Sequence, residues 1–449
     1  MKAPRSRKNA GLDSTAPDPL NLDASGPHRK DTWRFALPLL LLLYLGFACV
    51  HALVVPVGQT GYQNAPDEAA HVNFVRSVAS FHLPTHDHPT PFSDIPVANG
   101  YEWHQPPLYY VVAAPFLVFG ERGVRFCSIV FGLCALLLIY RAGRLLFPAD
   151  RVVALLAVGL AALTPTHIAI TSTVNNDVLL EVCFSATLLL LIGALQTGFI
   201  RRTALWVGLT IGAAILTKAT GLLLLPVFGL ALFLMWRSGT SWRELVRHAA
   251  VTLVIVALLS GWWFVRNQAL YGQPLPLRLF AADFGMTAQA APRAEAMGGW
   301  GAYYLQAGLL TFLSFWAVYG RTAHDAKYGI PEFLPEQIYL LLGIACLCAA
   351  GGMVRLHLQR RALFTTVQLQ SLWLCFLTIA FVGMSYLAFI AKYFQMQGRY
   401  LFPAMLPIAV VFALAFRGAF PERWKNPASG LLLALLGATA FAFLRFVMP

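Results

Sequence analysis

Long apolar runs alternate along this chain with polar connections. Eleven of these runs approach or reach the length of about 20 residues that a helix needs to cross a bilayer. Because lipid offers no partner to backbone N–H and C=O groups, we expect each run to form a helix. The runs cover residues 35–55, 124–146, 152–171, 178–197, 203–219, 221–236, 248–265, 337–354, 366–390, 400–416 and 428–446. The pattern predicts an all-α polytopic membrane protein with about 11 transmembrane helices.

Threading these runs through the membrane leaves two long connections on one face, residues 57–106 and 266–336. Long connections in a compact domain commonly carry function. The stretches 107–120 and 299–319 are weakly amphipathic, so we expect short interfacial helices beside these loops. Residues 35–449 are therefore predicted to form one transmembrane domain with its polar chemistry on one face.

Residues 1–34 are rich in Lys, Arg, Pro, Asp and Ser, which predicts a disordered tail. The run 35–55 has the length of a span and no clear cleavage site after it, so we interpret it as an anchor. Basic residues gather in the tail and in the short connections, whereas acidic residues lie mostly on the opposite face. The positive-inside rule then predicts a cytoplasmic N-terminus and two extracytoplasmic loops.

The composition supports the membrane class, since 58% of the residues are hydrophobic and only 12% are charged. A net charge of +13 could indicate nucleic-acid binding, but the basic residues form short clusters between apolar runs, so we expect no nucleic-acid partner. The 7 cysteines lie in or beside the runs without the spacing of a zinc site. A Walker A sequence is absent, which argues against ATP-driven transport. The absence of Asp-x-Asp argues against an enzyme that uses nucleotide sugars on the cytoplasmic face.

The first outer loop begins with a proline followed by two carboxylates, Asp67 and Glu68, and then His71. Pro66 suits the first position of a helix, and acidic residues suit its first turn. One interpretation is a solvated helix start. The other is a catalytic site in which one carboxylate is a general base and His71 shares the helix face of Asp67. Which of the two carboxylates would be the base stays open.

The same loop ends in Tyr101-Glu102-Trp103-His104-Gln105-Pro106-Pro107. Two prolines fix the backbone where the chain returns to the membrane, and aromatic residues favour the interface. An aromatic belt explains the Trp and Tyr residues but not the His-Gln-Pro-Pro turn. We therefore predict that Glu102, His104 and Gln105 bind substrate.

Asn176 and Asp177 precede the fourth run, where they could cap a helix or provide a second acidic group for substrate or metal. Lys218 lies at the outer junction of two runs, either as a snorkelling lysine or as a counter-charge for phosphate. Two further cations open onto the same face, Arg266 with Tyr271 nearby and Arg399 beside Tyr400. We predict that Lys218, Arg266 and Arg399 converge on one phosphate.

No motif demands a cofactor. His86-Asp87-His88 contains metal-ligand residue types, but it lies among Pro and Thr residues in an irregular loop. Whether a divalent cation binds therefore stays open, and the sequence assigns no site to one.

In their order along the chain and their common face, these motifs resemble the GT-C superfamily of polytopic glycosyltransferases, which includes protein O-mannosyltransferases and lipid A aminoarabinose transferases. The resemblance covers most of the chain after residue 34. It rests on Pro66-Asp67-Glu68-Ala-Ala-His71, Gln105-Pro106-Pro107-Leu108-Tyr109-Tyr110, Asn175-Asn176-Asp177, Leu216-Thr217-Lys218, Arg266-Asn267, Tyr271-Gly272-Gln273-Pro274 and Gln397-Gly398-Arg399-Tyr400.

This resemblance implies a donor sugar on a polyprenyl phosphate, an acceptor that is a glycan, a lipid or a protein, and Asp67 as catalytic base. Aminoarabinose transferases often have a lysine before Pro-Pro, where this chain has Gln105 preceded by His104. Bacterial membrane proteins with the same Pro-Asp-Glu and Gly-Arg-Tyr signatures imply a bacterial inner (plasma) membrane. The leading hypothesis is an inverting glycosyltransferase at the extracytoplasmic face. The alternative is a non-catalytic transporter of lipid-linked glycan or polysaccharide.

Overall fold

The computed structural model describes residues 33–57, 65–87, 101–283, 285, 288–318 and 333–447. Most of the predicted tail, residues 1–32, lies outside the described residues, as do parts of both predicted outer loops. Within the described ranges every regular element is a helix, apart from one isolated bridge between Gln289 and Tyr393. The prediction of an all-α polytopic membrane protein is confirmed.

The long helices are α1 (Ala36–Val54), α4 (Gly120–Leu146), α5 (Arg151–Leu163), α7 (Asp177–Thr197), α8 (Arg201–Thr217), α9 (Leu224–Arg237), α10 (Trp242–Tyr271), α13 (Trp300–Trp316), α14 (Glu336–Leu363), α15 (Thr366–Ile390), α16 (Met405–Gly418) and α17 (Glu422–Val447). The short ones are α2 (Glu68–Ala79), η2 (Tyr101–His104), α3 (Leu108–Ala113), η3 (Ala114–Phe119), α6 (Pro165–Thr171), η4 (Ala219–Leu223), α11 (Leu277–Asp283), α12 (Ala290–Ala296) and η6 (Gly398–Ala404).

Among the described residues, 9 helical segments are long and apolar enough to cross a membrane. α5 and α6 pass the same test only as a bent pair, which raises the number to 10. The predicted run 203–219 forms α8, which has 17 residues, one turn or so short of the thickness of a typical hydrocarbon core. The number of eleven spans therefore stays a prediction.

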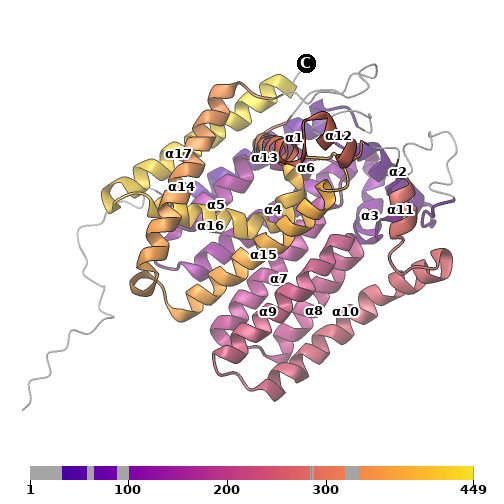
Figure 1. The fold of residues 1–449 in the computed structure, drawn as a ribbon, viewed down its shortest axis with the longest axis horizontal. Coiled ribbons are helices and arrows are strands. Elements are labelled where there is room, and N and C mark those ends of the chain that lie inside the picture. The colour runs from indigo at the N-terminus through magenta and orange to yellow at the C-terminus, as the bar shows by residue number, and fades with distance from the viewer. Residues whose placement is uncertain are drawn as a thin grey trace, which may run out of the picture.

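The centre of the bundle is formed by α5 and α7, which both pack against α4. Nearly every residue of α5 is buried, and α5 packs against α4, α16 and α17. α7 packs on α4 and α8, and α8 in turn packs on α10. Figure 1 shows α8, α9 and α10 on one side of this centre and α14 and α17 on the other, with α2, α3 and α11 together at one end. Three of the short helices, α2, α3 and α11, thus lie together near the polar motifs of the first outer loop.

Two breaks in the helices shape that end of the bundle. α5 and α6 meet at an angle of 69°, with Pro165 as the first residue of α6. Because proline has no N–H and clashes with the preceding turn, a helix cannot continue straight through it. α8 ends at Thr217, and Lys218 adopts an extended conformation with φ −159° and ψ 145° before η4 begins. Both breaks bring the chain into the polar region before the next long helix starts.

The first outer loop differs from its prediction at one residue. α2 begins at Glu68, and Asp67 precedes it in the left-handed conformation, with φ 64° and ψ 2°. A left-handed conformation is uncommon for residues other than glycine, although Asp tolerates it better than most. The two carboxylates therefore do not share the first helical turn, and consecutive side chains point in different directions.

Candidate functional site

A cavity of about 570 Å³ lies between α2, η2, α11 and α15. Its apolar wall comes mainly from α11, the segment before it and α15, and its polar wall from the start of α2, η2, the break after α8 and η6. The polar lining residues are Asp67, His71, Glu102, His104, Gln105, Lys218, Thr220, Asp283, Ser385, Tyr386, Gln395, Arg399 and Tyr400. Residues from several motifs that lie far apart in the sequence thus line one cavity.

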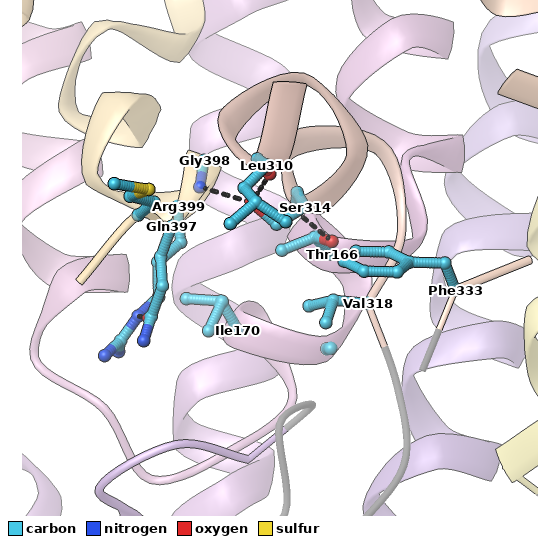
Figure 2. Close-up of a pocket in the computed structure, with 11 residues that line it drawn as sticks. Thr166, Ile170, Leu310, Ser314, Val318, Phe333, Gln397, Gly398 and Arg399 are labelled. Carbon is cyan, nitrogen blue, oxygen red and sulfur yellow. Dashed lines mark hydrogen bonds between the residues drawn. The ribbon is translucent and has the colours of Figure 1, made fainter. Parts of the chain in front are cut away.

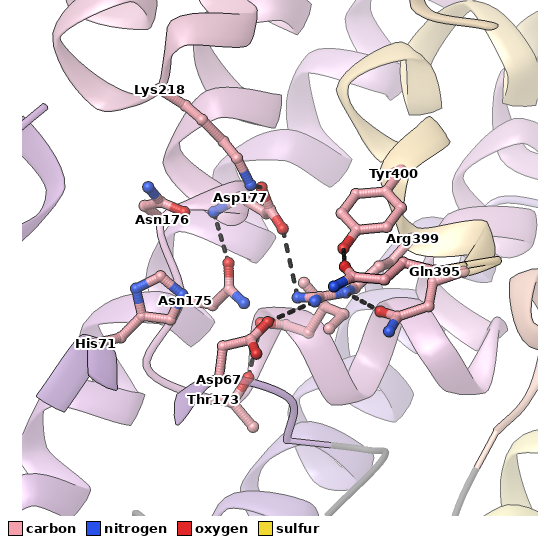
Figure 3. Close-up of polar contacts among 12 residues, drawn as sticks. Asp67, His71, Thr173, Asn175, Asn176, Asp177, Lys218, Gln395, Arg399 and Tyr400 are labelled. Carbon is pink, nitrogen blue, oxygen red and sulfur yellow. Dashed lines mark hydrogen bonds and ion pairs between the residues drawn. The ribbon is translucent and has the colours of Figure 1, made fainter. Parts of the chain in front are cut away.

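Arg399 lies between two carboxylates in this cavity (Figure 3). Its Nη2 donates to Asp67 Oδ2 over 2.6 Å, and its Nη1 is 3.8 Å from Asp177 Oδ2. Nε donates to Gln397 Oε1, which fixes the plane of the guanidinium. The side chain of Arg399 is 6% exposed, whereas that of Asp67 is 34% exposed. Asp67 is therefore the member of this group that a ligand in the cavity can reach most easily.

Lys218 makes the second ion pair of the cavity. Its Nζ donates to Asp177 Oδ1 over 2.5 Å. Lys218 can reach Asp177 because the break after α8 turns the side chain toward the start of α7. Two cations and two carboxylates thus form one continuous cluster, in which each positive charge already has a negative partner.

The turn before α7 is held by its own amide side chains. Asn175 Oδ1 accepts from the Asp177 N–H over 2.7 Å. Asn176 Nδ2 donates to Gln105 Oε1 and to the Thr217 carbonyl, both over 3.1 Å. These bonds join the end of the first outer loop, the break after α8 and the start of α7. The prediction for Asn176 and Gln105 stays a prediction, but the structure places both residues beside the ion pairs.

His71 and Glu102 form a second polar part of the wall. His71 Nδ1 and the Tyr110 hydroxyl lie 2.8 Å apart, and His71 is 2% exposed. Burial lowers the pKa of His71, so the imidazole is neutral at pH 7. Burial also raises the pKa of Glu102, which is 6% exposed. Among the described residues, Glu102 Oε2 has no hydrogen-bond partner.

Glu68 is not among the described residues that line the cavity. It forms a two-pronged ion pair with Arg125 of α4, over 2.5 and 2.7 Å, and it accepts from the Val174 N–H over 2.8 Å. Arg125 also donates to the carbonyls of Ala52, Val55 and Pro56 at the end of α1. The side chains of Arg125 and Glu68 are 0% and 1% exposed. This arrangement ties the start of α2 to α4 and to the end of α1, and of the two carboxylates it is Asp67 that lines the cavity.

Arg266 and Tyr271 also lie outside the described lining of the cavity. Arg266 donates to the Pro84 carbonyl and to Asn267, and its guanidinium stacks 4.7 Å from the ring of Trp263. The Tyr271 hydroxyl accepts from the His86 N–H, and its ring packs against Trp103. Arg266 therefore does not line this cavity with Lys218 and Arg399, because its position on α10 directs it to the backbone of the 81–87 segment, and its part in a phosphate site stays a prediction.

A smaller cavity of about 60 Å³ also has Arg399 in its wall (Figure 2). Thr166 donates to the Ser314 carbonyl, and the Gly398 N–H donates to Ser314 Oγ. A Cβ on Gly398 would lie 2.4 Å from the backbone of Phe315. Glycine at position 398 thus allows η6 to approach α13 closely, and this approach places Arg399 at the border of both cavities.

Sequence reasoning missed Arg125, Asp283 and Gln395. Arg125 lies inside the predicted apolar run 124–146, and a charged residue at such a position is a strong signal of a buried partner. Asp283 accepts from Trp103 Nε1 over 2.9 Å and lies 3.3 Å from His86 Nε2. Gln395 accepts from the Tyr400 hydroxyl over 2.9 Å. Neither Asp283 nor Gln395 belongs to a motif that the sequence alone sets apart.

No group of three or more His, Cys, Asp or Glu residues suited to a metal ion occurs in the described part of the chain. His88 of the His86-Asp87-His88 motif lies outside that part. His86 instead contacts Asp87 and Asp283.

Residues 104–264 match the family described as dolichyl-phosphate-mannose-protein mannosyltransferase. Among solved structures, the chain is similar to the oligosaccharyltransferase of Archaeoglobus fulgidus in complex with Zn and sulfate, with 16% identity and a TM-score of 0.52 over 91% of this chain and 53% of that chain. The same archaeal protein tethered to an acceptor peptide gives 16% identity and a TM-score of 0.50, over 93% and 56%. ArnT of Cupriavidus metallidurans bound to undecaprenyl phosphate gives 15% and 0.49, over 88% and 61%. No curated protein matches the chain.

The chain spans little more than half the length of these solved structures, and at such identities the likeness to the archaeal protein concerns the fold. The chain shares its fold with the archaeal oligosaccharyltransferase structures, which agrees with the fold that the resemblance of its motifs to the GT-C superfamily implied. The activity and the substrates of the whole protein have to be argued from its own site.

Proposed function

We propose that this protein is an inverting glycosyltransferase that transfers a sugar from a polyprenyl-phosphate lipid to an acceptor at the extracytoplasmic face of a bacterial inner membrane. Asp67 is the general base, and Lys218 and Arg399 hold the phosphate that leaves. The acceptor is a glycan, a lipid or a protein. The N-terminus is cytoplasmic, in agreement with the distribution of basic residues.

The observation that supports this proposal most strongly is the presence of a reachable carboxylate and two cations in one cavity with an apolar wall. Asp67, Lys218 and Arg399 all line it, and Leu275, Leu277, Phe280, Val382 and Phe389 provide the apolar surface. A sugar on a lipid phosphate requires this combination, because the leaving phosphate is anionic and its chain stays in the bilayer. Removal of the acceptor proton needs the carboxylate as a base, and stabilisation of the charge on the leaving phosphate needs the cations.

The reaction is a single displacement. The acceptor oxygen attacks C1 of the sugar, its proton passes to Asp67, and the bond from C1 to the phosphate oxygen breaks with its electron pair leaving on the phosphate. Attack opposite to the leaving group inverts the configuration at C1. Lys218 and Arg399 stabilise the phosphate as its charge increases, which lowers the barrier without protonating the leaving group.

The ion pair between Arg399 and Asp67 fits this sequence of events. The guanidinium holds the Asp67 carboxylate in place at the cavity wall, where the carboxylate can accept a proton. A donor phosphate competes with Asp67 for the same guanidinium. As Arg399 turns toward the phosphate, the carboxylate loses a positive neighbour and becomes more basic, at the moment when an acceptor proton has to be removed.

The test is a transfer assay with purified protein in liposomes that contain polyprenyl-phosphate mannose as donor. Asp67→Asn keeps the shape of the side chain but removes its basicity, so the rate of transfer should fall by about 100-fold or more, while donor binding stays within about threefold. Glu336→Gln changes an exposed carboxylate at the start of α14 and should leave the rate unchanged.

The same liposomes should also be tested with glucose and amino-sugar donors. If Asp67→Asn transfers the accepted sugar at the wild-type rate, Asp67 is not the base. If the wild-type protein moves labelled lipid-linked sugar between the two leaflets without transferring it to any acceptor, the protein is a transporter instead.

A further inference from the structure

Glu102 is the one acidic residue of the cavity wall without an ion-pair partner in the described part of the chain. Asp67 pairs with Arg399, and Asp283 contacts Trp103 and His86. Glu102 is 6% exposed, and its Oε2 is buried without a hydrogen-bond partner among the described residues. A buried polar atom of this kind costs free energy unless a ligand provides the missing partner.

The surroundings of Glu102 indicate what that partner is. The residue lines the cavity together with neutral His71 and with Gln105, which also lies close enough to hydrogen-bond the Glu102 side chain. Burial raises the pKa of Glu102, because it removes water from around the charged form. Hydrogen-bond donors from a ligand would stabilise the charged form, and a ligand carboxylate would do the opposite.

We infer that Glu102 recognises the sugar of the donor, by accepting a hydrogen bond from a hydroxyl or an amino group, and that it excludes sugars that carry a carboxylate. This inference rests on the proposed function and names its substrate class, neutral or amino sugars. The phosphate of the same donor occupies Lys218 and Arg399. The polar wall thus divides into a cationic part for the phosphate and an acidic part for the sugar.

Charge supports this division of the wall. The cavity and its first neighbours contain Asp67, Glu102, Asp177 and Asp283, against the cations Lys218 and Arg399. A phosphate takes up the cations and leaves an excess of carboxylates around the sugar. A uronic acid would add one more negative charge within a few ångströms of Glu102, in a site where burial strengthens the repulsion.

The experiment compares the affinities of detergent-solubilised protein for polyprenyl phosphates that carry mannose, glucuronic acid or an amino sugar. Wild-type protein should bind the mannose lipid about tenfold or more tightly than the glucuronic acid lipid. Glu102→Gln keeps the shape and removes the charge, so the ratio of the two affinities should fall to within about threefold. The amino-sugar lipid shows whether Glu102 contacts an amino group or a hydroxyl. If it contacts an ammonium, Glu102→Gln should weaken the binding of this lipid more than the binding of the mannose lipid.

Two further variants make the result specific. Lys218→Gln should weaken the binding of all three lipids and leave their ratios unchanged, because it removes a contact to the phosphate. Glu244→Gln, an exposed residue on α10, should change nothing. A Glu102→Gln variant with the wild-type ratio, or a wild-type protein that prefers glucuronic acid, would overturn the inference while the proposed function stands. A protein that binds none of the lipids overturns both.

Discussion

Breaking the buried ion pair between Glu68 and Arg125 should cause a large loss of stability. We expect the pair itself to have little role in the transfer reaction. Glu68→Gln leaves the Arg125 guanidinium buried beside an amide oxygen and the carbonyls of Ala52, Val55 and Pro56, which are neutral and do not balance its charge. Removal of one member of a fully buried pair typically costs about 3 to 5 kcal/mol, because the remaining charge has no compensation. Since both side chains are essentially unexposed, we expect an effect of that size here.

The assay is equilibrium denaturation in detergent micelles, carried out as a double-mutant cycle with Glu68→Gln, Arg125→Met and both together. The double variant should be more stable than the sum of the single losses predicts, because it removes the uncompensated charge. Glu121→Gln is a matched control, since the pair between Glu121 and Arg76 is exposed and such pairs contribute at most about 1 kcal/mol. The structural assignment would be refuted if Glu68→Gln unfolded like the wild type and lost transfer as completely as Asp67→Asn.

Other contacts in the structure support three further predictions. Lys218→Gln should weaken binding of polyprenyl phosphate about tenfold or more in a vesicle assay, whereas Arg266→Gln, whose side chain is outside the cavity, should change it by less than about threefold. Gly398→Ala should lower the stability by about 1 to 3 kcal/mol and reduce transfer, because the new Cβ would meet the Phe315 backbone. Gly430→Ala, which has open space around it, should do neither, and equal melting temperatures for the two variants would contradict the packing argument. The hydrogen bond to Asp87 raises the pKa of His86 above 6.5, and Asp283 adds to the effect. The ion pair between His86 and Asp283 of α11 is therefore present below pH 6.5 and is lost as the pH rises through the raised pKa. An NMR titration should show a lower His86 pKa in Asp87→Asn, and an unchanged pKa would count against the contact.

Spans and site were not equally predictable. The helices followed from the apolar runs because lipid allows few alternatives, and the predicted bounds 366–390 are those of α15. The bend at Thr164–Pro165 was hidden, because both of its arms are apolar and read as one run, 152–171. A transmembrane helix pattern records how apolar each residue is, and it does not record the direction of the next segment.

The cavity shows the same limit in its side chains. Asp67, Lys218 and Arg399 were predicted to share a face, and they do line one cavity, because each occurs where a helix begins or breaks on that face. Arg266 has the same sequence signature, but the rotation of α10 about its axis decides whether its side chain reaches the cavity or the Pro84 carbonyl. The difference between Asp67 and Glu68 depends on one left-handed residue, and no residue pattern in the sequence reveals that conformation.

The bend between α5 and α6 has a mechanical consequence. A straight helix can slide along its axis or rotate about it while its neighbours adjust, but two arms at 69° can do neither unless both lose their packing. Every residue of α6 is buried, and α6 contacts α1, α7, α13 and η6. The bend therefore acts as a fixed corner for the turn that precedes Asp177. Any motion that admits a substrate has to occur elsewhere, and α11, which lines the cavity and contains no buried residue, is the wall segment that can move at the least cost.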